Sequence, residues 1–440
     1  LLQQIYTISD AAIVGQTLSA GEVAGVNDTT SIVAIFLQFA FGVSAGFCVV
    51  TSSRVGARDQ AGVRRSLTTQ IVLSAALTVL LTALALVLLN PLLAWINVTP
   101  DSPEIYRAAF TYCAIIFGGT GAQLFYNFIC SFLRSLGDSV TPLLFLLFST
   151  VLNIGLDLLF ILAFRLGVIG AAAATVLAQA VSALLCLIYA FGKYPELHLS
   201  GQDFRAELSV YAQHLSQGLP MGLQFSVLAI GIIVMQRALV GFDIGPDGIM
   251  AAGNPAQNGF GAANKLNNFL MCPMNALSTA IVSFNAQNLG AGKYDRIRAG
   301  FRAGVRLVWC VCAPLVALYL LAGRQLVYVF MDSPTGEAMD VGVIFLRILS
   351  PFYFVVSAKI IADSVLRGAG RMKGFVIATF TDLILRVALA EVLSRTSLGS
   401  TGIWLAWPIG WCIAAVLSLI FCHTTHFDDR QVREIANVET

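Results

Sequence analysis

The stretch that decides the fold occurs twice in the chain. Residues 131–137 read SFLRSLG, and residues 364–370 read SVLRGAG. Two more pairs keep nearly the same spacing, so the offset stays between 232 and 234 residues: 54–59 with 288–293, and 166–170 with 398–402. A repeat that runs through the whole chain predicts two related halves.

The composition predicts a membrane protein. Of 440 residues, 57% are hydrophobic and 11% are charged, whereas a soluble domain carries about 25% charged residues. The net charge of +2, with basic residues scattered, does not favour a nucleic-acid partner. The nine cysteines lie mostly in apolar runs and show no spacing typical of a metal site or a disulfide framework.

A membrane-spanning helix needs about 20 mostly apolar residues. We predict twelve, at residues 1–21, 29–53, 66–100, 108–133, 139–156, 166–192, 208–236, 266–292, 307–330, 342–364, 374–394 and 396–425. The predicted fold is therefore an all-α membrane protein with two six-helix bundles, related by a pseudo-two-fold axis along the membrane normal. The predicted parts are an N-terminal lobe (1–195), a cytoplasmic linker (196–207), a C-terminal lobe (208–425) and a cytoplasmic tail (426–440).

The loops predict the orientation. Most loop Lys and Arg residues follow even-numbered spans, and such residues favour the cytoplasmic side. Both termini of this multi-pass protein of the cell membrane are then cytoplasmic. Because the chain begins at Leu1 inside an apolar segment, we expect the first span to be shortened at its N-terminal end.

Ionisable residues inside spans are costly and are candidates for function. In the first half these are Asp10 and Asp157, and Asn153 lies one helical turn before Asp157. Thr175, in the next span, adds a hydroxyl. Carboxylates, an amide and a hydroxyl together predict a site for a proton or Na⁺, with no other metal and no cofactor. The alternative for Asp157 is a purely structural hydrogen bond to Asn153.

The second half carries a different set of charges. Asp382 and Arg386 lie one turn apart and are expected to form a buried ion pair, which is more often structural than functional. Glu391 lies further along the same span, and the choice between a structural and a functional role is open for all three. Lys359, like Arg237 and Lys265, is expected to extend to a membrane interface or alternatively to line a cavity.

At this point the chain resembles the MATE (multidrug and toxic compound extrusion) family, and in particular its DinF-like and MepA-like bacterial branch. The resemblance is carried by QIYTISD (4–10), LRSLGDSVTP (133–142), NIGLD (153–157), ANKLNNF (263–269) and QNLGAG (287–292). It implies twelve helices in two lobes, and export of cationic amphipathic compounds driven by inward H⁺ or Na⁺.

The resemblance also implies site residues. DinF-like members have a cation site made by an Asp on the first span, an Asn and an Asp on the fifth and a Thr on the sixth, which Asp10, Asn153, Asp157 and Thr175 match. NorM-like members add acids on the seventh and tenth spans. Here the seventh span has no acid after Glu207, and residues 352–357 have none, so the resemblance does not extend to a second-lobe cation site.

The predicted function is that of a secondary active multidrug exporter, an antiporter and not an enzyme, which works by alternating access. Its partners are small cationic amphipathic molecules and the lipid bilayer, and it is expected to act as a monomer. The substrate cavity is predicted at Gln4, Phe36, Tyr126, Gln224 and Tyr353, where aromatic rings can stack on cations. The alternative is a flippase for lipid-linked precursors or oligosaccharides from the same superfamily, for which a cation-rich cavity would be expected.

Overall fold

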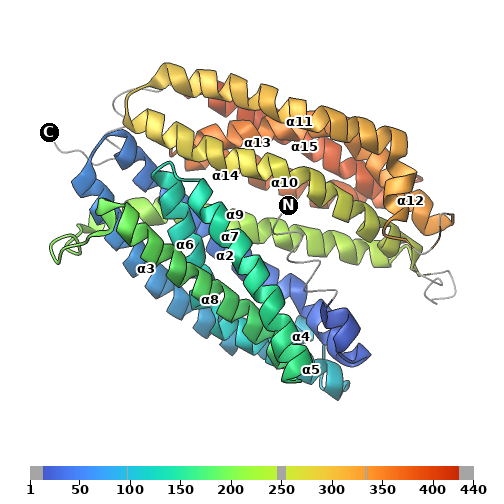
Figure 1. Ribbon diagram of the computed structural model, residues 1–440. Coiled ribbons are helices and arrows are strands. Elements are labelled where there is room, and N and C mark those ends of the chain that lie inside the picture. Colours follow the sequence, from blue (N-terminus) through green and yellow to red (C-terminus); the bar gives the residue numbers. More distant parts are fainter. Residues whose placement is uncertain (1–12, 97, 245–253, 332, 334, 426–440) are drawn as a thin grey trace. The chain divides into compact units, whose positions relative to one another are not determined.

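The computed structural model describes residues 13–96, 98–244, 254–331, 333 and 335–425, and this part of the chain is built almost entirely of helices (Figure 1). The described residues up to Ala229 form one compact unit, and those from Ile230 onward form a second. The first unit contains α2 (Ala20–Gly56), α3 (Gln60–Val87), α4 (Leu89–Trp95), α5 (Pro103–Gly118), α6 (Thr120–Ser135), α7 (Val140–Asp157), the π-helix η1 (Leu158–Ala163), α8 (Val168–Lys193), the 3-10 helix η2 (Pro195–Leu197) and the first part of α9 (Leu208–Val240). The second contains the rest of α9, α10 (Pro255–Gly290), α11 (Tyr294–Tyr328), α12 (Glu337–Leu349), the 3-10 helix η3 (Ser350–Phe352), α13 (Tyr353–Gly368), α14 (Met372–Ser394) and α15 (Ser400–Thr424).

The predicted spans from the second to the twelfth each overlap with one helix or with two or three consecutive helices. The fourth is the pair α5 and α6, bent by 45°, and the bend falls at Gly118 and Gly119, where glycine makes a kink inexpensive. Within the described residues, eight helices are long and apolar enough to cross a membrane, or nine if the bent pair is one span. The first predicted span lies largely outside the described residues.

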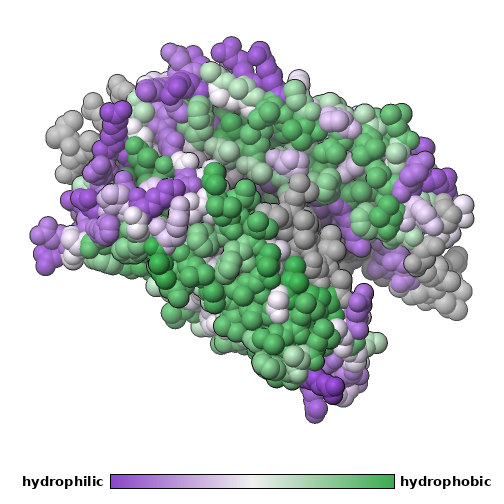
Figure 2. Space-filling view, in the orientation of Figure 1, coloured by the Kyte–Doolittle hydropathy of each residue, from purple (hydrophilic) through white to green (hydrophobic). Residues whose placement is uncertain are grey.

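The helix surfaces explain why the chain needs a bilayer. Large apolar side chains such as Val151, Ile384 and Val416 are more than half exposed. Figure 2 shows apolar residues over much of the visible helix surface, with hydrophilic residues gathered towards the helix ends. Apolar area left in water costs about 25 cal/mol per Å², whereas lipid chains solvate it without that cost. The chain is therefore a multi-pass membrane protein.

The repeat predicted from the sequence has a structural counterpart at the ends of α6 and α13. Arg134 Nη2 donates to Ser131 Oγ over 2.9 Å, and Arg367 Nη2 donates to Ser364 Oγ over 3.2 Å. The related stretches 131–137 and 364–370 thus make the same local contact.

Backbone conformation repeats as well, in the loops that precede α8 and α15. Gly167 has φ 58° and ψ −136°, and Gly399 has φ 53° and ψ −134°. Residues other than glycine rarely adopt backbone angles in this region of positive φ. Each glycine is therefore required at the equivalent turn of its half, which confirms that the halves are related in structure.

Close packing inside the first unit depends on small residues. A Cβ built on Gly46 of α2 would lie 2.6 Å from the Cα of Gly218 in α9 and 2.6 Å from the carbonyl oxygen of Gln217. Gly42 meets the carbonyl oxygen of Met221 at the same distance, one turn along. Small residues that let two backbones approach are typical of helix contacts in membranes.

Candidate functional site

The side chains of α7 sort the helix into a lipid-exposed face and a buried polar face. Val140, Leu147 and Val151 are exposed, and the opposite face buries a set of polar residues: Thr141, Ser149, Thr150, Asn153 and Asp157. The spacing of three to four residues keeps the polar side chains on one side of the helix. Polar groups that face lipid are costly, so the sequence of α7 itself turns this face towards the interior of the first unit.

Asn153 and Asp157 lie one turn apart on this buried face, and both side chains have 0% exposure. Asp157 is the last residue of α7, and the π-helix η1 begins at Leu158. A π-helical turn is rare and occurs frequently at functional sites. The change in helical geometry therefore falls at the carboxylate that the sequence analysis selected.

The Asn153 amide is an unusual buried group. Neither its oxygen nor its nitrogen has a hydrogen-bond partner among the described residues. A fully buried amide in a protein is normally hydrogen-bonded, and an exception calls for an explanation such as a bound ion or water. The amide is therefore available as a ligand.

The other two predicted members of the cation site are placed differently. Thr175 lies on α8, which packs along α7 in the first unit, and its side chain is half-buried. Asp10 lies outside the described residues. The structure thus puts Asn153, Asp157 and Thr175 on two neighbouring helices, and the assignment of all four residues to one cation site stays a prediction.

The residues predicted to line a substrate cavity are distributed over both units. Phe36 packs on Phe117 with ring centroids 4.9 Å apart, and Tyr126 belongs to the buried core around Phe132. Tyr353 is fully buried and donates to Asn267 Oδ1 over 2.8 Å.

Gln224 completes the described members of this set. It is buried on α9, and its Oε1 has no hydrogen-bond partner within the described part of the chain. Gln4 lies outside the described residues. The role of all five residues in substrate binding stays a prediction.

A chain of hydrogen bonds in the first unit was missed by the sequence analysis. His214 Nδ1 lies 2.8 Å from the carbonyl oxygen of Val210, and its Nε2 lies 2.7 Å from Ser66 Oγ. Ser66 Oγ is also 2.7 Å from Thr51 Oγ1, which accepts from Gln70. Because a carbonyl can only accept, Nδ1 carries the proton, and the neutral ring accepts from Ser66. The one available signal was a histidine within the charge-free run 208–236.

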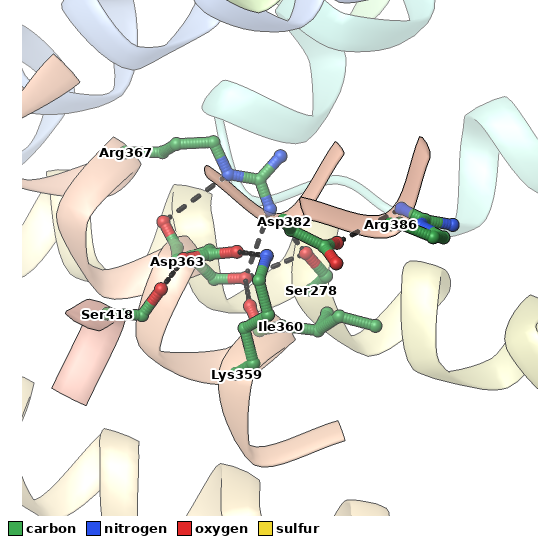
Figure 3. A network of polar contacts seen from close by, with 9 residues as sticks. Ser278, Lys359, Ile360, Asp363, Arg367, Asp382, Arg386 and Ser418 are labelled. Atoms are coloured by element: carbon green, nitrogen blue, oxygen red, sulfur yellow. Dashed lines mark hydrogen bonds and ion pairs between the residues drawn. The ribbon is translucent and has the colours of Figure 1, made fainter. Parts of the chain in front are cut away.

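The second unit contains a buried ionic cluster on α13 (Figure 3). Lys359 Nζ lies 2.7 Å from Asp363 Oδ2, and Ser418 of α15 donates to Asp363 Oδ1 over 2.6 Å. One turn further, Arg367 donates to Ser278 of α10 over 2.5 Å. Lys359 is 5% exposed, so the expectation that it extends to an interface is wrong: a carboxylate at the spacing of one turn binds its ammonium group inside the unit.

The predicted ion pair on α14 is present. Arg386 Nη2 lies 3.1 Å from Asp382 Oδ2, and both side chains are less than one-tenth exposed (Figure 3). The guanidinium carbon lies 4.9 Å from the ring centroid of Trp407 on α15. Glu391 instead contacts Arg395 at the exposed end of the helix. Of these three residues, only Asp382 and Arg386 are therefore buried together.

Comparison with known proteins adds a family. The sequence model of the MatE family matches residues 1–159 and 253–392. A relative from Bacillus subtilis, YpnP, named as a probable multidrug resistance protein, is 28% identical over 421 residues, which cover 96% of this chain and 91% of the relative. A relative from Shewanella oneidensis, named as an FAD transporter, is 23% identical over 92% of this chain and 87% of its own.

The fold also matches solved structures. A MOP superfamily transporter from Pyrococcus furiosus aligns with a TM-score of 0.87 at 22% sequence identity, over 98% of this chain and 93% of that one. At this identity the likeness shows the fold, twelve helices in two bundles, and nothing about what is transported.

Proposed function

Because this chain belongs to the MatE family and is a membrane transporter and not an enzyme, we propose that it is a secondary active exporter of cationic amphipathic compounds, driven by H⁺ or Na⁺ entering the cell. It acts in the cell membrane with both termini in the cytoplasm. The observation that carries the proposal is the fully buried pair of Asn153 and Asp157 at the junction of α7 and η1.

The chemistry of this pair suits ion coupling. A carboxylate in a low-dielectric interior gains much from a proton or a monovalent cation, because its charge is otherwise poorly solvated. An amide oxygen with no other partner among the described residues, and the hydroxyl of Thr175 on the neighbouring helix, are oxygen ligands of the kind that Na⁺ accepts. Ion binding at Asp157 removes a buried charge and so favours one of two conformations of the first unit over the other.

The ion gradient limits the substrate gradient that one coupling site can sustain. One-for-one exchange of a monovalent cationic substrate for H⁺ or Na⁺ moves no net charge, so a tenfold ion gradient of about 1.4 kcal/mol sustains about a tenfold substrate gradient. A second ion per cycle would add about 2.3 kcal/mol for each 100 mV of membrane potential. A single coupling cluster therefore predicts transport that follows the ion gradient and is insensitive to membrane potential.

The test is ethidium transport in proteoliposomes with an imposed proton gradient or an imposed Na⁺ gradient, each applied alone. Asp157→Asn should abolish transport driven by the effective ion and leave the amount of folded protein unchanged. The matched control is Ser149→Ala, which removes a buried hydroxyl from the same face of α7. Transport that is unchanged in Asp157→Asn, or equally lost in Ser149→Ala, would contradict the proposal.

A further inference from the structure

The pair on α14 is part of a larger buried cluster in the second unit. Thr379, Asp382 and Arg386 follow one face of α14, and the ring of Trp407 on α15 lies against the guanidinium group. The four residues are at most 8% exposed. Four of their polar atoms have no hydrogen-bond partner in the described part of the chain: Thr379 Oγ1, Asp382 Oδ1, Arg386 Nε and Trp407 Nε1.

The repeat relates this cluster to the first unit. Offsets of 232 to 233 residues pair Ser149 with Asp382, Asn153 with Arg386, Thr175 with Trp407 and Ala178 with Gly410. The structure supports the pairing at the level of contacts. Ser149 Oγ lies 3.5 Å from the carbonyl oxygen of Ala178, and a Cβ built on Gly410 would lie 2.8 Å from Asp382 Oδ1. The cluster therefore occupies, within its own helix pair, the position of the candidate cation site within α7 and α8.

The chemistry of the cluster is that of a cation site. A carboxylate and the face of an indole ring both attract a planar monovalent cation, and together they hold it on two sides. The guanidinium of Arg386 meets both groups. Because the guanidinium group is covalently part of the chain, this occupant cannot leave.

A pair that served packing alone would be expected to have its hydrogen-bonding groups satisfied, because a partly satisfied buried ion pair is less favourable than an apolar replacement. Here Asp382 retains a second oxygen, and Arg386 a second donor, without a partner among the described residues. Gly410 lets that oxygen lie close against α15, because a Cβ at this position would be only 2.8 Å from it.

We infer that Asp382 and Trp407 form a cation-binding site in the second unit, and that the guanidinium of Arg386 occupies it as a tethered ion. The second unit then carries a fixed cation where the first unit has an exchangeable one. One consequence, which rests on the proposed function, is that ion coupling is confined to the first unit.

The test removes the side chain of Arg386 and supplies guanidinium in solution. Arg386→Ala should lower the thermal unfolding temperature of the purified protein by about 5 °C or more, and low-millimolar guanidinium chloride should restore most of the loss. NaCl and KCl at equal ionic strength serve as comparison salts. The same guanidinium additions should have no effect on the wild type or on the double variant Asp382→Asn/Arg386→Ala, which lacks the carboxylate. No restoration, or equal restoration in the double variant, overturns the inference.

A second comparison covers the case in which Arg386→Ala fails to accumulate. Arg386→Lys keeps a cation next to Asp382, and Arg386→Gln replaces it with a neutral amide of similar shape. The lysine variant should unfold close to the wild-type temperature and the glutamine variant well below it, whereas equal temperatures would overturn the inference. Because the readout is unfolding and not transport, this result stands independently of whether the protein exports ethidium.

Discussion

Lys359 Nζ and Asp363 Oδ2 lie 2.7 Å apart on α13, and both side chains are less than one-tenth exposed. Glu391 at the end of α14 and Arg395 directly after the helix have the same spacing of four residues but are 55% and 77% exposed. The two pairs are equal in sequence spacing and opposite in environment. Burial, not spacing, should therefore decide what each contributes to stability.

The buried pair predicts a large stability effect. Asp363→Asn leaves the Lys359 ammonium group buried without its carboxylate partner, which should cost about 3 to 5 kcal/mol. The double variant Lys359→Met/Asp363→Asn should recover most of that loss, since no uncompensated ammonium remains. Thermal unfolding in detergent measures both. The matched control, Glu391→Gln, should change stability by less than about 1 kcal/mol; similar losses at the two sites would refute the argument from burial.

The hydrogen bond between Ser66 and His214 predicts that the loss of one hydroxyl group lowers the stability of the protein. Ser66 donates to His214 Nε2 over 2.7 Å, and removing it leaves a buried acceptor without a donor. Ser66→Ala should therefore destabilise the protein by about 1 to 3 kcal/mol. Ser216→Ala, at an exposed position of α9, the helix that carries His214, is the control and should be close to neutral. If the two variants unfold alike, the hydrogen bond is not contributing as the geometry implies.

The Asn153 amide predicts a separation of stability from transport. Since neither of its polar atoms has a protein partner in the described residues, Asn153→Leu should leave the unfolding temperature unchanged or raise it, because an unsatisfied buried amide costs about 1 to 3 kcal/mol. Ion-driven ethidium transport should fall. Lower stability with normal transport would show that the amide is structural and not a ligand.

The glycine contact between α2 and α9 predicts a packing effect. A Cβ at position 46 would lie 2.6 Å from backbone atoms of Gln217 and Gly218. Gly46→Ala should therefore push the helices apart and destabilise the first unit by about 1 to 3 kcal/mol. Gly192→Ala is the control, since an added methyl group there meets nothing within 4 Å, and it should be neutral or stabilising by about 0.4 to 1 kcal/mol. The prediction is wrong if Gly46→Ala unfolds at the same temperature as Gly192→Ala or at a higher one.

The loop between α6 and α7 predicts a pH dependence. Burial alone would raise the pKa of Asp138, but hydrogen bonds from Thr141, Tyr194 and Lys193 outweigh it and hold the pKa well below its ordinary value. A carboxylate with a depressed pKa stabilises the folded state above its unfolded pKa of about 3.9 and loses that contribution as the pH falls through the folded value. Asp138→Asn should therefore unfold at a lower temperature than the wild type at pH 7. The difference between the unfolding temperatures of the wild type and the variant should become smaller only in acid. A difference that grows as the pH falls would contradict this assignment.

Much of the fold could be predicted without coordinates. The two related stretches at 131–137 and 364–370, and apolar runs long enough to cross a bilayer, predicted a helical membrane protein in two halves. The face shared by Asn153 and Asp157 was equally predictable, because a separation of four residues fixes neighbours on a helix whatever surrounds it. The same rule predicted the pair of Asp382 and Arg386.

Contacts between helices could not be predicted in this way. The sequence gives no rotation of one helix against another, so nothing indicated that Ser418 of α15 would reach Asp363, or that Ser66 of α3 would reach His214 of α9. Burial could not be predicted either: the long side chain of Lys359 suits a membrane interface equally well, and only the tertiary structure shows that it pairs with Asp363 in a closed interior.

What the sequence determined by itself was the repeat, the spans and which residues of one helix share a face, since these follow from chain connectivity and helical period. The tertiary structure alone decided which polar groups are buried, which are satisfied and which remain without a partner among the described residues, as Asn153 does in one unit and Asp382 Oδ1 in the other. The physical reason is that desolvation depends on what packs around a side chain in three dimensions, and a buried charge or amide has consequences that the same group in water does not.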